Sequence, residues 1–446
     1  NRGKSWQSMR GNLPDRTLVW RLVQDHVRPE LMFVATEFGI YFTIDAGKQW
    51  TKLQGGVPTI SFRDLAIQRR ENDLVGASFG RSFYILDDYS PLREISADQM
   101  KEEATLFAGI RKAWWYIPRP GVGFNGKGNQ GAAYYTAKNP DFGASFTYYL
   151  KDGLSTKAGD RKKADQKLAK DNQDIPFPGW DALEAERTQS KPKIWLTVKD
   201  AAGNVVRRLE GPTSKGIHRV SWDLRSSSLM PMRLKDKRSP NQANGVMMPP
   251  GTYSVSMAKE VDGQITPLSE PRSFQVERLR KGALEGDKPE TVAAFWKDLA
   301  ETQAMAIATN AVLRQQMDKV AAMKVALSRS ASEPGALDSQ LAAVIKKLHD
   351  LDGQLNGNRS KQQIGEKNNP TVQSRLGAVS TGVNNATYGP TPTHKATFEI
   401  AKAELGEIRS ALQTITGDDM PKLEDALRKV GAPMIEGQAL PVGGEE

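Results

Sequence analysis

The sequence predicts a multidomain chain that is mainly β-structure at first and α-helical toward its C-terminal end. Three observations carry this prediction. Short strand-like segments repeat with a period above 40 residues in 1–97, alternating apolar strands follow in 144–280, and from Pro289 the apolar residues recur about every 3.6 positions. A chain of 446 residues is long enough for roughly two to four domains.

A turn motif marks the first region. The stretch from Thr43 to Trp50 approximates Ser/Thr-x-Asp-x-Gly-x-Ser/Thr-Trp, a pattern called an Asp-box, and residues 1–6 repeat its second half. Gly3 and Gly47 lie 44 positions apart, which is the length of a four-stranded β-propeller blade. The sequence therefore predicts the last blades of an Asp-box β-propeller, about two of them, in residues 1–97. Structural roles in the turns are expected for Gly3, Trp6, Thr43, Asp45, Gly47 and Trp50.

Two blades do not close a propeller, which typically has at least about four. The first copy of the motif also starts at its Asp position, where Asn1 stands. We therefore expect upstream propeller blades of the same protein as the partner of this region.

An immunoglobulin-like β-sandwich is predicted for residues 144–280, after a crossover segment at 98–143. Residues 194–198 and 205–209 form an alternating hairpin around the turn at 202–204. Trp195, Val220 and Tyr253 are expected to face its core. A polar stretch near 151–191 is interpreted as an insertion.

The C-terminal region, residues 287–435, is predicted to be a helical hairpin or bundle. Helices are expected from Pro289 onward and over 336–355, 396–416 and 421–430. Residues 356–392 are polar and are expected to form a loop, and residues 436–446 a flexible tail.

The composition excludes several kinds of site. There is no Cys, so disulfides and thiolate chemistry are absent, and the four His lie far apart without metal-ligand spacing. The net charge of +10 is spread along the chain rather than gathered in a nucleic-acid-binding stripe, and no apolar run approaches ~20 residues. We expect no cofactor, no metal, no nucleic-acid partner and no membrane span.

Candidate ligand contacts are aromatic. Flat rings suit the apolar faces of sugars, so the candidate glycan-stacking residues are Trp114, Trp115, Tyr116, Tyr134, Tyr135 and Trp180. The alternative is that these rings pack the seam between the propeller and the sandwich.

The Gly-x-Gly-x-x-Gly string at 121–126 neither clearly follows a buried strand nor opens a helix, and the adjacent Asp87 and Asp88 point to opposite faces of a strand. Neither is interpreted as a catalytic site.

Residues 33–92, with Phe38-Gly39, Gly80-Arg81 and the run from Ile85 to Leu92, resemble the final blades of bacterial BNR-repeat, sortilin-type (VPS10) glycosyl-hydrolase-like proteins. Residues 200–255 resemble the FlgD-type Ig-like module that follows those blades. The resemblance implies a bacterial protein that is secreted, periplasmic or on the cell surface. It implies a structural or binding module for glycan or protein ligands. The alternative is part of a secreted glycoside hydrolase whose catalytic carboxylates lie in upstream blades, since no catalytic residue maps onto this chain.

Overall fold

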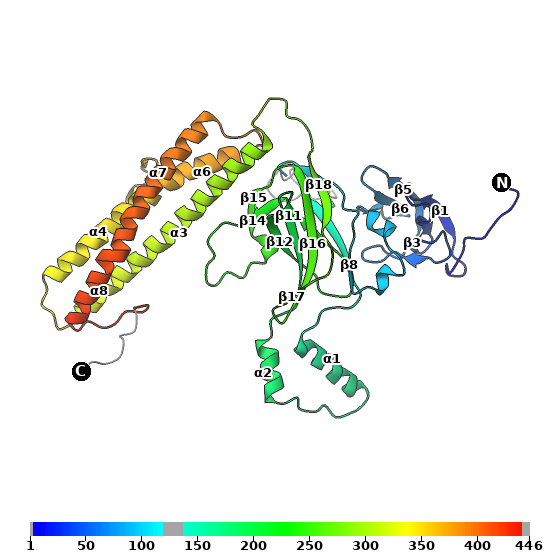
Figure 1. Cartoon of the computed structure of the whole chain (residues 1–446), viewed down its shortest axis with the longest axis horizontal. Helices are drawn as coiled ribbons and strands as arrows, with labels where there is room; N and C mark the ends of the chain where they lie inside the picture. The colour runs from blue at the N-terminus through cyan, green and yellow to red at the C-terminus, as the bar shows by residue number, and fades with distance from the viewer. Residues whose placement is uncertain (1–2, 119–136, 439–446) are drawn as a thin grey trace. The chain divides into compact units, whose positions relative to one another are not determined.

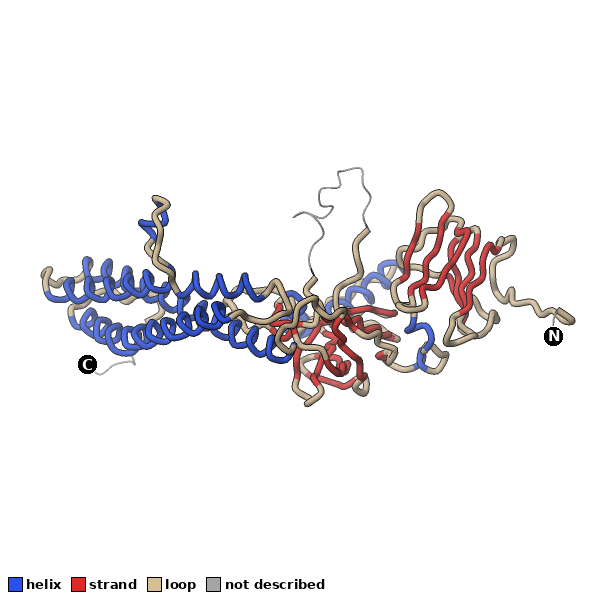
Figure 2. Tube along the Cα trace, turned by 90° about the horizontal axis from the view of Figure 1, so that it is seen from above, coloured by secondary structure: helices blue, strands red, loops and turns tan. Residues whose placement is uncertain are grey.

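The computed structural model describes residues 3–118 and 137–438 (Figure 1). The chain divides into two compact units, and each is described by itself. The β-rich unit comprises Asn1–Ser227, Arg238–Ala243 and Pro250–Leu279, and the helical unit comprises the rest. The prediction of a multidomain chain with β-structure first and helices last is confirmed, as the colouring by secondary structure shows (Figure 2).

Two small antiparallel sheets open the β-rich unit. The first small sheet has four strands in the order β1 (Val19–Gln24), β2 (Met32–Thr36), β3 (Gly39–Thr43) and β4 (Thr51–Lys52). The second small sheet has three: β5 (Phe62–Gln68), β6 (Asp73–Ser78) and β7 (Phe83–Leu86). Both sheets are meanders, in which consecutive strands pair.

The two small sheets pack face to face through apolar side chains. Leu31, Phe33 and Ala35 of the first sheet region form one buried cluster with Phe62 and Leu74 of the second. Successive residues of a strand point to opposite faces, so the other residues of β2 face away from this cluster. On the far side of the first small sheet, Met32, Val34 and Tyr41 form a second buried cluster with Leu13 and Trp50.

Two larger sheets follow and lie against each other. One has the order β13-β10-β8, from β8 (Ala104–Leu106), β10 (Ala144–Leu150) and β13 (Gly216–Trp222). The other has the order β12-β11-β16-β18-β9, with β17 paired to β16, from β9 (Ala113–Trp115), β11 (Lys193–Asp200), β12 (Val205–Gly211), β16 (Gly251–Val261), β17 (Gln264–Pro267) and β18 (Arg272–Arg278).

Aromatic rings join these two larger sheets. Phe146 contacts Phe274 with centroids 5.2 Å apart, and Trp222 contacts Tyr253 at 5.1 Å. Val220 and Tyr253 are buried as expected. Trp195 is buried too, but it alternates with Ile194 and Leu196 and so lies on the other face of its sheet, where Lys193 and Arg208 cover its ring.

The crossover segment and the polar insertion both contain regular secondary structure. The crossover at 98–143 contributes β8 and β9 to the larger sheets, because Leu106 and Trp115 are apolar enough to enter the core. The polar insertion near 151–191 forms two helices, α1 (Lys157–Lys170) and α2 (Trp180–Thr188). Single 3-10 turns occur at Ser90–Arg93, Gln99–Lys101 and Pro240–Gln242, and β14 spans Arg225–Ser227.

The helical unit consists of β15 (Asn244–Met247), which contacts α3, and a set of helices lying side by side. These are α3 (Pro289–Ser328), α4 (Ala336–Asn356), α5 (Arg359–Gln363), α6 (Val372–Val383), α7 (Pro392–Thr414) and α8 (Met420–Lys429), with a π turn at Ile415–Asp419. In the described part of the chain, no helix is both long and apolar enough to cross a membrane.

The expectation of a loop over 356–392 is wrong, because α5 and α6 lie there. Val372, Leu376, Val379 and Val383 of α6 are buried at helical spacing, and Thr371 caps the helix by accepting a hydrogen bond from the N–H of Ser374. Polar neighbours such as Ser374 and Asn384 hide this short stripe in the sequence. Of the expected tail, residues 439–446 lie outside the described residues.

Candidate binding surfaces

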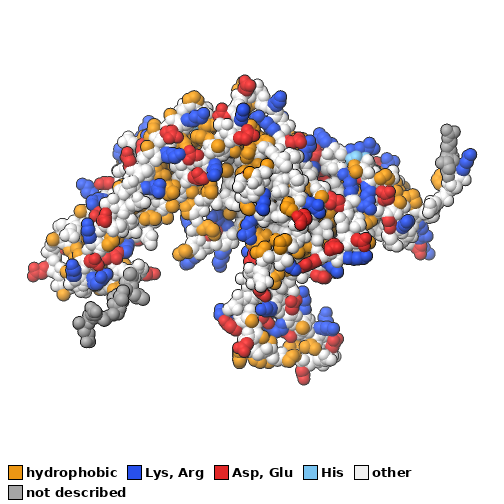
Figure 3. Space-filling model, viewed as in Figure 1, with side chains coloured by type: hydrophobic (Ala, Val, Ile, Leu, Met, Phe, Trp, Pro, Cys, Tyr) orange, Lys and Arg blue, Asp and Glu red, His pale blue; other side chains and the backbone are white. Residues whose placement is uncertain are grey.

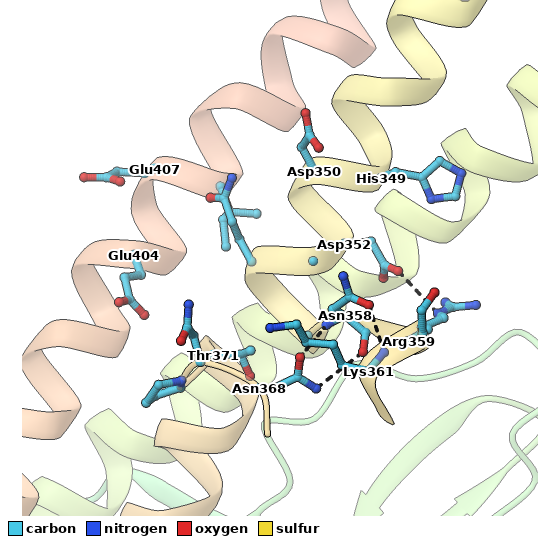
Figure 4. A pocket seen from close by; sticks show the side chains of 17 residues that line it. His349, Asp350, Asp352, Asn358, Arg359, Lys361, Asn368, Thr371, Glu404 and Glu407 are labelled. Atoms are coloured by element: carbon cyan, nitrogen blue, oxygen red, sulfur yellow. Dashed lines mark hydrogen bonds and ion pairs between the residues drawn. The ribbon is translucent and has the colours of Figure 1, made fainter. Parts of the chain in front are cut away.

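A pocket of about 1010 Å³ lies in the helical unit, between α4, α5, the start of α6 and α7 (Figure 4). Its lining comes from four elements spread over 60 positions, so no local sequence pattern indicates it. The lining comprises His349, Asp350, Asp352, Gln354, Asn358, Arg359, Ser360, Lys361, Asn368, Asn369, Pro370, Thr371, Glu404, Glu407 and Ile408, with Gly353 and Gly357.

The loop that forms one rim of this pocket is held by its own hydrogen bonds. The backbone N–H of Asn358 donates to Oδ1 of Asn368 at 3.2 Å, and Nδ2 of Asn368 donates to the carbonyl oxygen of Asn358 at 3.4 Å. Oδ1 of Asn358 also caps α5 by accepting from the N–H of Lys361 at 3.1 Å. These bonds fix the distance between α5 and the start of α6.

Charges of both signs line the pocket. Asp352 is buried and accepts a hydrogen bond from Nδ2 of Asn356 at 2.8 Å, while Nε of Arg359 lies 3.4 Å from its other oxygen. Glu404, on α7, pairs with Nε of Arg375 at 3.2 Å. The pocket is thus polar without a dominant sign of charge.

The candidate glycan-stacking aromatics do not form one site. Trp115 is only 1% exposed and packs in the core, so its faces are covered. Trp114 is partly exposed and lies beneath the ammonium of Lys112 at 5.0 Å, while the exposed ring of Tyr116 meets Phe142 edge-on. Tyr134 and Tyr135, like the glycine string at 121–126, lie outside the described residues.

Trp180 stands apart from the other aromatics. It begins α2 and is 78% exposed, and its ring contacts that of Phe177 with centroids 5.1 Å apart. The two rings are inclined at 69°, so they offer an angular apolar surface rather than a flat platform.

The turn at Thr43–Trp50, predicted to be an Asp-box, is built around one carboxylate. Oδ1 of Asp45 accepts hydrogen bonds from the Thr43 hydroxyl at 2.7 Å and from the backbone N–H groups of Lys48 at 3.0 Å and Gln49 at 2.9 Å. Gly47 has a φ of 88°, which is unfavourable for residues with a side chain. The hydrogen bonds that the Asp45 carboxylate accepts all come from residues of this turn, so its role there is to stabilise the turn.

The Trp residues of the two Asp-box copies differ in their surroundings. Trp50 is buried, and its Nε1 donates to the carbonyl oxygen of Met9 at 2.9 Å. Trp6 is exposed, although Gly3 has a positive φ of 80° like its counterpart Gly47.

A buried ion pair connects the two small sheets. Asp25 lies at the end of β1 and accepts from Nε and Nη2 of Arg93 at 2.9 and 2.8 Å and from the hydroxyl of Tyr89 at 2.6 Å. Burial raises the pKa of Asp25, but the bonds from Arg93, Tyr89 and the N–H groups of Arg28 and Val27 outweigh burial. The pKa therefore lies well below its usual value of 3.8.

Asp87 is the described carboxyl group whose pKa rises. Burial is the largest cause of the raised pKa, and the neighbouring carboxylate of Asp73 raises the pKa further. The positive charges of Arg219 and Arg111 lower it. Carboxyl groups with a raised pKa are common in active sites, but structural networks of charged groups also raise the pKa of a carboxyl group. Here the guanidinium of Arg219 donates to the backbone carbonyl oxygens of Asp87 and Asp88, both at 2.7 Å. These bonds tie β13 to the segment after β7, which indicates a structural role.

Apolar side chains are exposed on both small sheets. A groove of about 510 Å³ beside the first small sheet is lined by Met9, Arg10, Leu13, Pro14, Asp15, Arg16, Thr17, Val19, Leu22, Val34 and Trp50. Leu13, Val34 and Trp50 are buried there, whereas Met9, Val19 and Leu22 are 39%, 41% and 43% exposed. On the far side of the second small sheet, Phe83 and Ile85 are 69% and 59% exposed. The stack of two sheets therefore ends in apolar side chains at both sides.

Elsewhere the charged side chains are mixed. Figure 3 shows Lys and Arg interspersed with Asp and Glu over the visible face, without a patch of one sign. Among the described residues, no group of three or more His, Cys, Asp or Glu is arranged to hold a metal ion.

Comparison with known proteins identifies no family. No family model and no curated protein matches the chain. Three solved chains match, and two are structures of the extracellular domain of BT4673 from B. thetaiotaomicron, described as a one-component system in one and as a hybrid two-component system in the other.

The likeness to these structures is slight. Their sequence identities to this chain are 12% and 11%, each match covers 59% of this chain, and both TM-scores are 0.14. The chain spans about a quarter of the length of the structures it matches, 25% and 26%. A TM-score this low carries no argument about fold or function.

Proposed function

We propose that this chain is the C-terminal portion of an exported bacterial β-propeller protein, in which it serves as a structural and binding module for protein or glycan ligands. The observation that carries the proposal is the pair of surfaces with exposed apolar side chains on the two small sheets. In a propeller, each blade buries such surfaces against its two neighbours. The larger sheets would then form an Ig-like sandwich, and the helical unit an accessory domain.

The two surfaces lie on opposite sides of the stack. Val19 and Leu22 are exposed in the groove of the first small sheet, whereas Phe33 packs against the second. Phe83 and Ile85 of β7 are exposed, while Tyr84 and Leu86, the residues between and after them, pack against the buried cluster. Further blades of the same protein are the occupants that this geometry suits, one at each side.

The test compares the chain with a variant in which one surface is made polar. The double substitution Phe83→Ser and Ile85→Thr should reduce dye binding by apolar surface and shift light scattering toward the monomer mass. The matched control is Ile217→Thr with Ile265→Thr, two exposed apolar strand residues of the larger sheets. A chain that is monomeric and dye-free without any substitution would contradict the proposal.

The glycan part of the proposal has a separate observation. Trp180 is highly exposed beside Phe177, and exposed aromatic pairs are costly to leave in water unless a ligand covers them. The alternative, a secreted glycoside hydrolase, requires two carboxylates about 5 to 10 Å apart on other blades. Assaying the whole protein for polysaccharide cleavage separates binding from hydrolysis.

A further inference from the structure

The pocket of the helical unit presents three kinds of hydrogen-bonding group to one space. The carboxylate of Glu404 only accepts, the ammonium of Lys361 only donates, and the amides of Gln354, Asn358 and Asn369 do both. Figure 4 shows Lys361 reaching from α5 toward the wall that carries Glu404. No ion pair joins these two described residues, so a polar ligand can lie between them.

This mixture discriminates among ligand charges. A cation would meet Lys361 and Arg359, and an anion would meet Asp350, Glu404 and Glu407. A hydroxyl group can donate to a carboxylate and accept from an ammonium, and it suits an amide in either direction. We propose that this pocket binds a neutral saccharide.

The apolar part of the lining fits the same ligand. Pro370 is the exposed apolar side chain of the lining and can contact the C–H face of a pyranose ring, whereas Ile408 is 1% exposed and packs in the core. A volume of about 1010 Å³ is at the upper end for small-molecule sites, which run from about 300 to 1,000 Å³. The pocket is large enough for more than one sugar ring.

The rim is formed before any ligand arrives, which lowers the entropy lost on binding. The two hydrogen bonds between Asn358 and Asn368 close the loop. Gly357 has a φ of 95°, and a Cβ there would lie 3.1 Å from Nε2 of Gln362. The loop conformation therefore depends on glycine at this position.

This inference deepens the glycan part of the proposed function by naming a site and a ligand charge. It does not depend on the small sheets, because every lining residue belongs to the helical unit. Failure of the sugar-binding experiment and failure of the light-scattering experiment are thus separate results.

The experiment is saturation-transfer NMR on the full chain with glucose, galactose and mannose as neutral probes. Glucuronate and glucosamine are matched charged probes, each differing from glucose at one substituent. We expect at least one neutral hexose to bind, and its charged analogues to bind more weakly. No signal from any neutral hexose at tens of millimolar would overturn the proposal.

Two substitutions test the two sides of the pocket, one at Lys361 of α5 and one at Glu404 of α7. Lys361→Gln should weaken neutral sugar binding about two- to fivefold, the range for an exposed charged contact, and should favour glucosamine over glucuronate. Glu404→Gln should weaken it similarly and favour glucuronate. The control is Lys346→Gln, an exposed residue of α4 outside the pocket, which should change nothing.

Circular dichroism melting establishes that each variant is folded. Binding that is equal for all five probes, or equal between Lys361→Gln and Lys346→Gln, would show non-specific contact and overturn the proposal.

Discussion

At the scale of single residues, Asp25 is the strongest test of what joins the two small sheets. It is 3% exposed and receives three side-chain hydrogen bonds, two of them from Arg93. Asp25→Asn leaves Arg93 without a charged partner, which costs about 3 kcal/mol or more in buried pairs. Urea denaturation should show this loss at neutral pH. Asp15→Asn, in an exposed ion pair, should cost less than about 1 kcal/mol.

The pH dependence of this effect has a fixed sign. The folded pKa of Asp25 is depressed, so the carboxylate stabilises the fold fully above its unfolded pKa, near 3.8. This contribution is lost as the pH falls below that value toward the folded pKa. The difference between the native chain and Asp25→Asn should therefore shrink between pH 5 and about pH 2. A difference that grows on acidification would contradict the role of the charge.

Residue roles were only partly predictable from the sequence. Trp114, Trp115 and Tyr116 are consecutive and similar in type, yet Trp115 is buried and Trp114 only partly so, because a strand alternates its faces, and Tyr116 lies beyond the strand and is exposed. The sequence shows the aromatic run but not which face the core lies on. The sugar pocket was missed for another reason. Its Glu404 and Lys361 come to line the same pocket only after the helices pack.

At the scale of elements, α6 allows two glycines to be compared within one helix. Nothing lies within 4 Å of a Cβ placed at Gly377, so Gly377→Ala should stabilise the helical unit by about 0.5 to 1 kcal/mol. A Cβ at Gly382 would overlap the ring of His394. Since that ring is held by a hydrogen bond from the N–H of Thr391, Gly382→Ala should destabilise the unit.

Thermal unfolding followed by circular dichroism at 222 nm measures both changes. Both variants replace a glycine of α6 by alanine, so a difference between their melting temperatures reflects the space around the two positions. Similar melting temperatures for both variants would mean that α7 does not pack against α6 at His394.

Long or strongly alternating elements were the predictable ones. The hairpin at 194–209 and the first long helix follow from periodicity, because each repeats its apolar side over many residues. The helix α6 has only three turns, and β8 and β9 have three residues each. Such short elements are stabilised by the core they join, which a local pattern does not contain.

At the scale of the whole molecule, the two units have separate cores. The core of the β-rich unit includes Leu196, and that of the helical unit includes Leu405, both buried. Truncating either to Ala removes buried methyl groups and should cost about 2 to 5 kcal/mol. Because neither side chain belongs to the other unit's core, each truncation should destabilise its own unit alone.

Calorimetry of the full chain should accordingly show two transitions. Leu196→Ala should lower the temperature of one and Leu405→Ala that of the other, and hydrogen exchange of peptides from each unit should assign them. Two-state unfolding is usual for single domains and fails for chains with separate cores. If both substitutions moved a single transition equally, the units would unfold as one cooperative body. The helical unit would then be an extension of the β-rich core, and sugar binding at its pocket would be linked to the stability of the sheets.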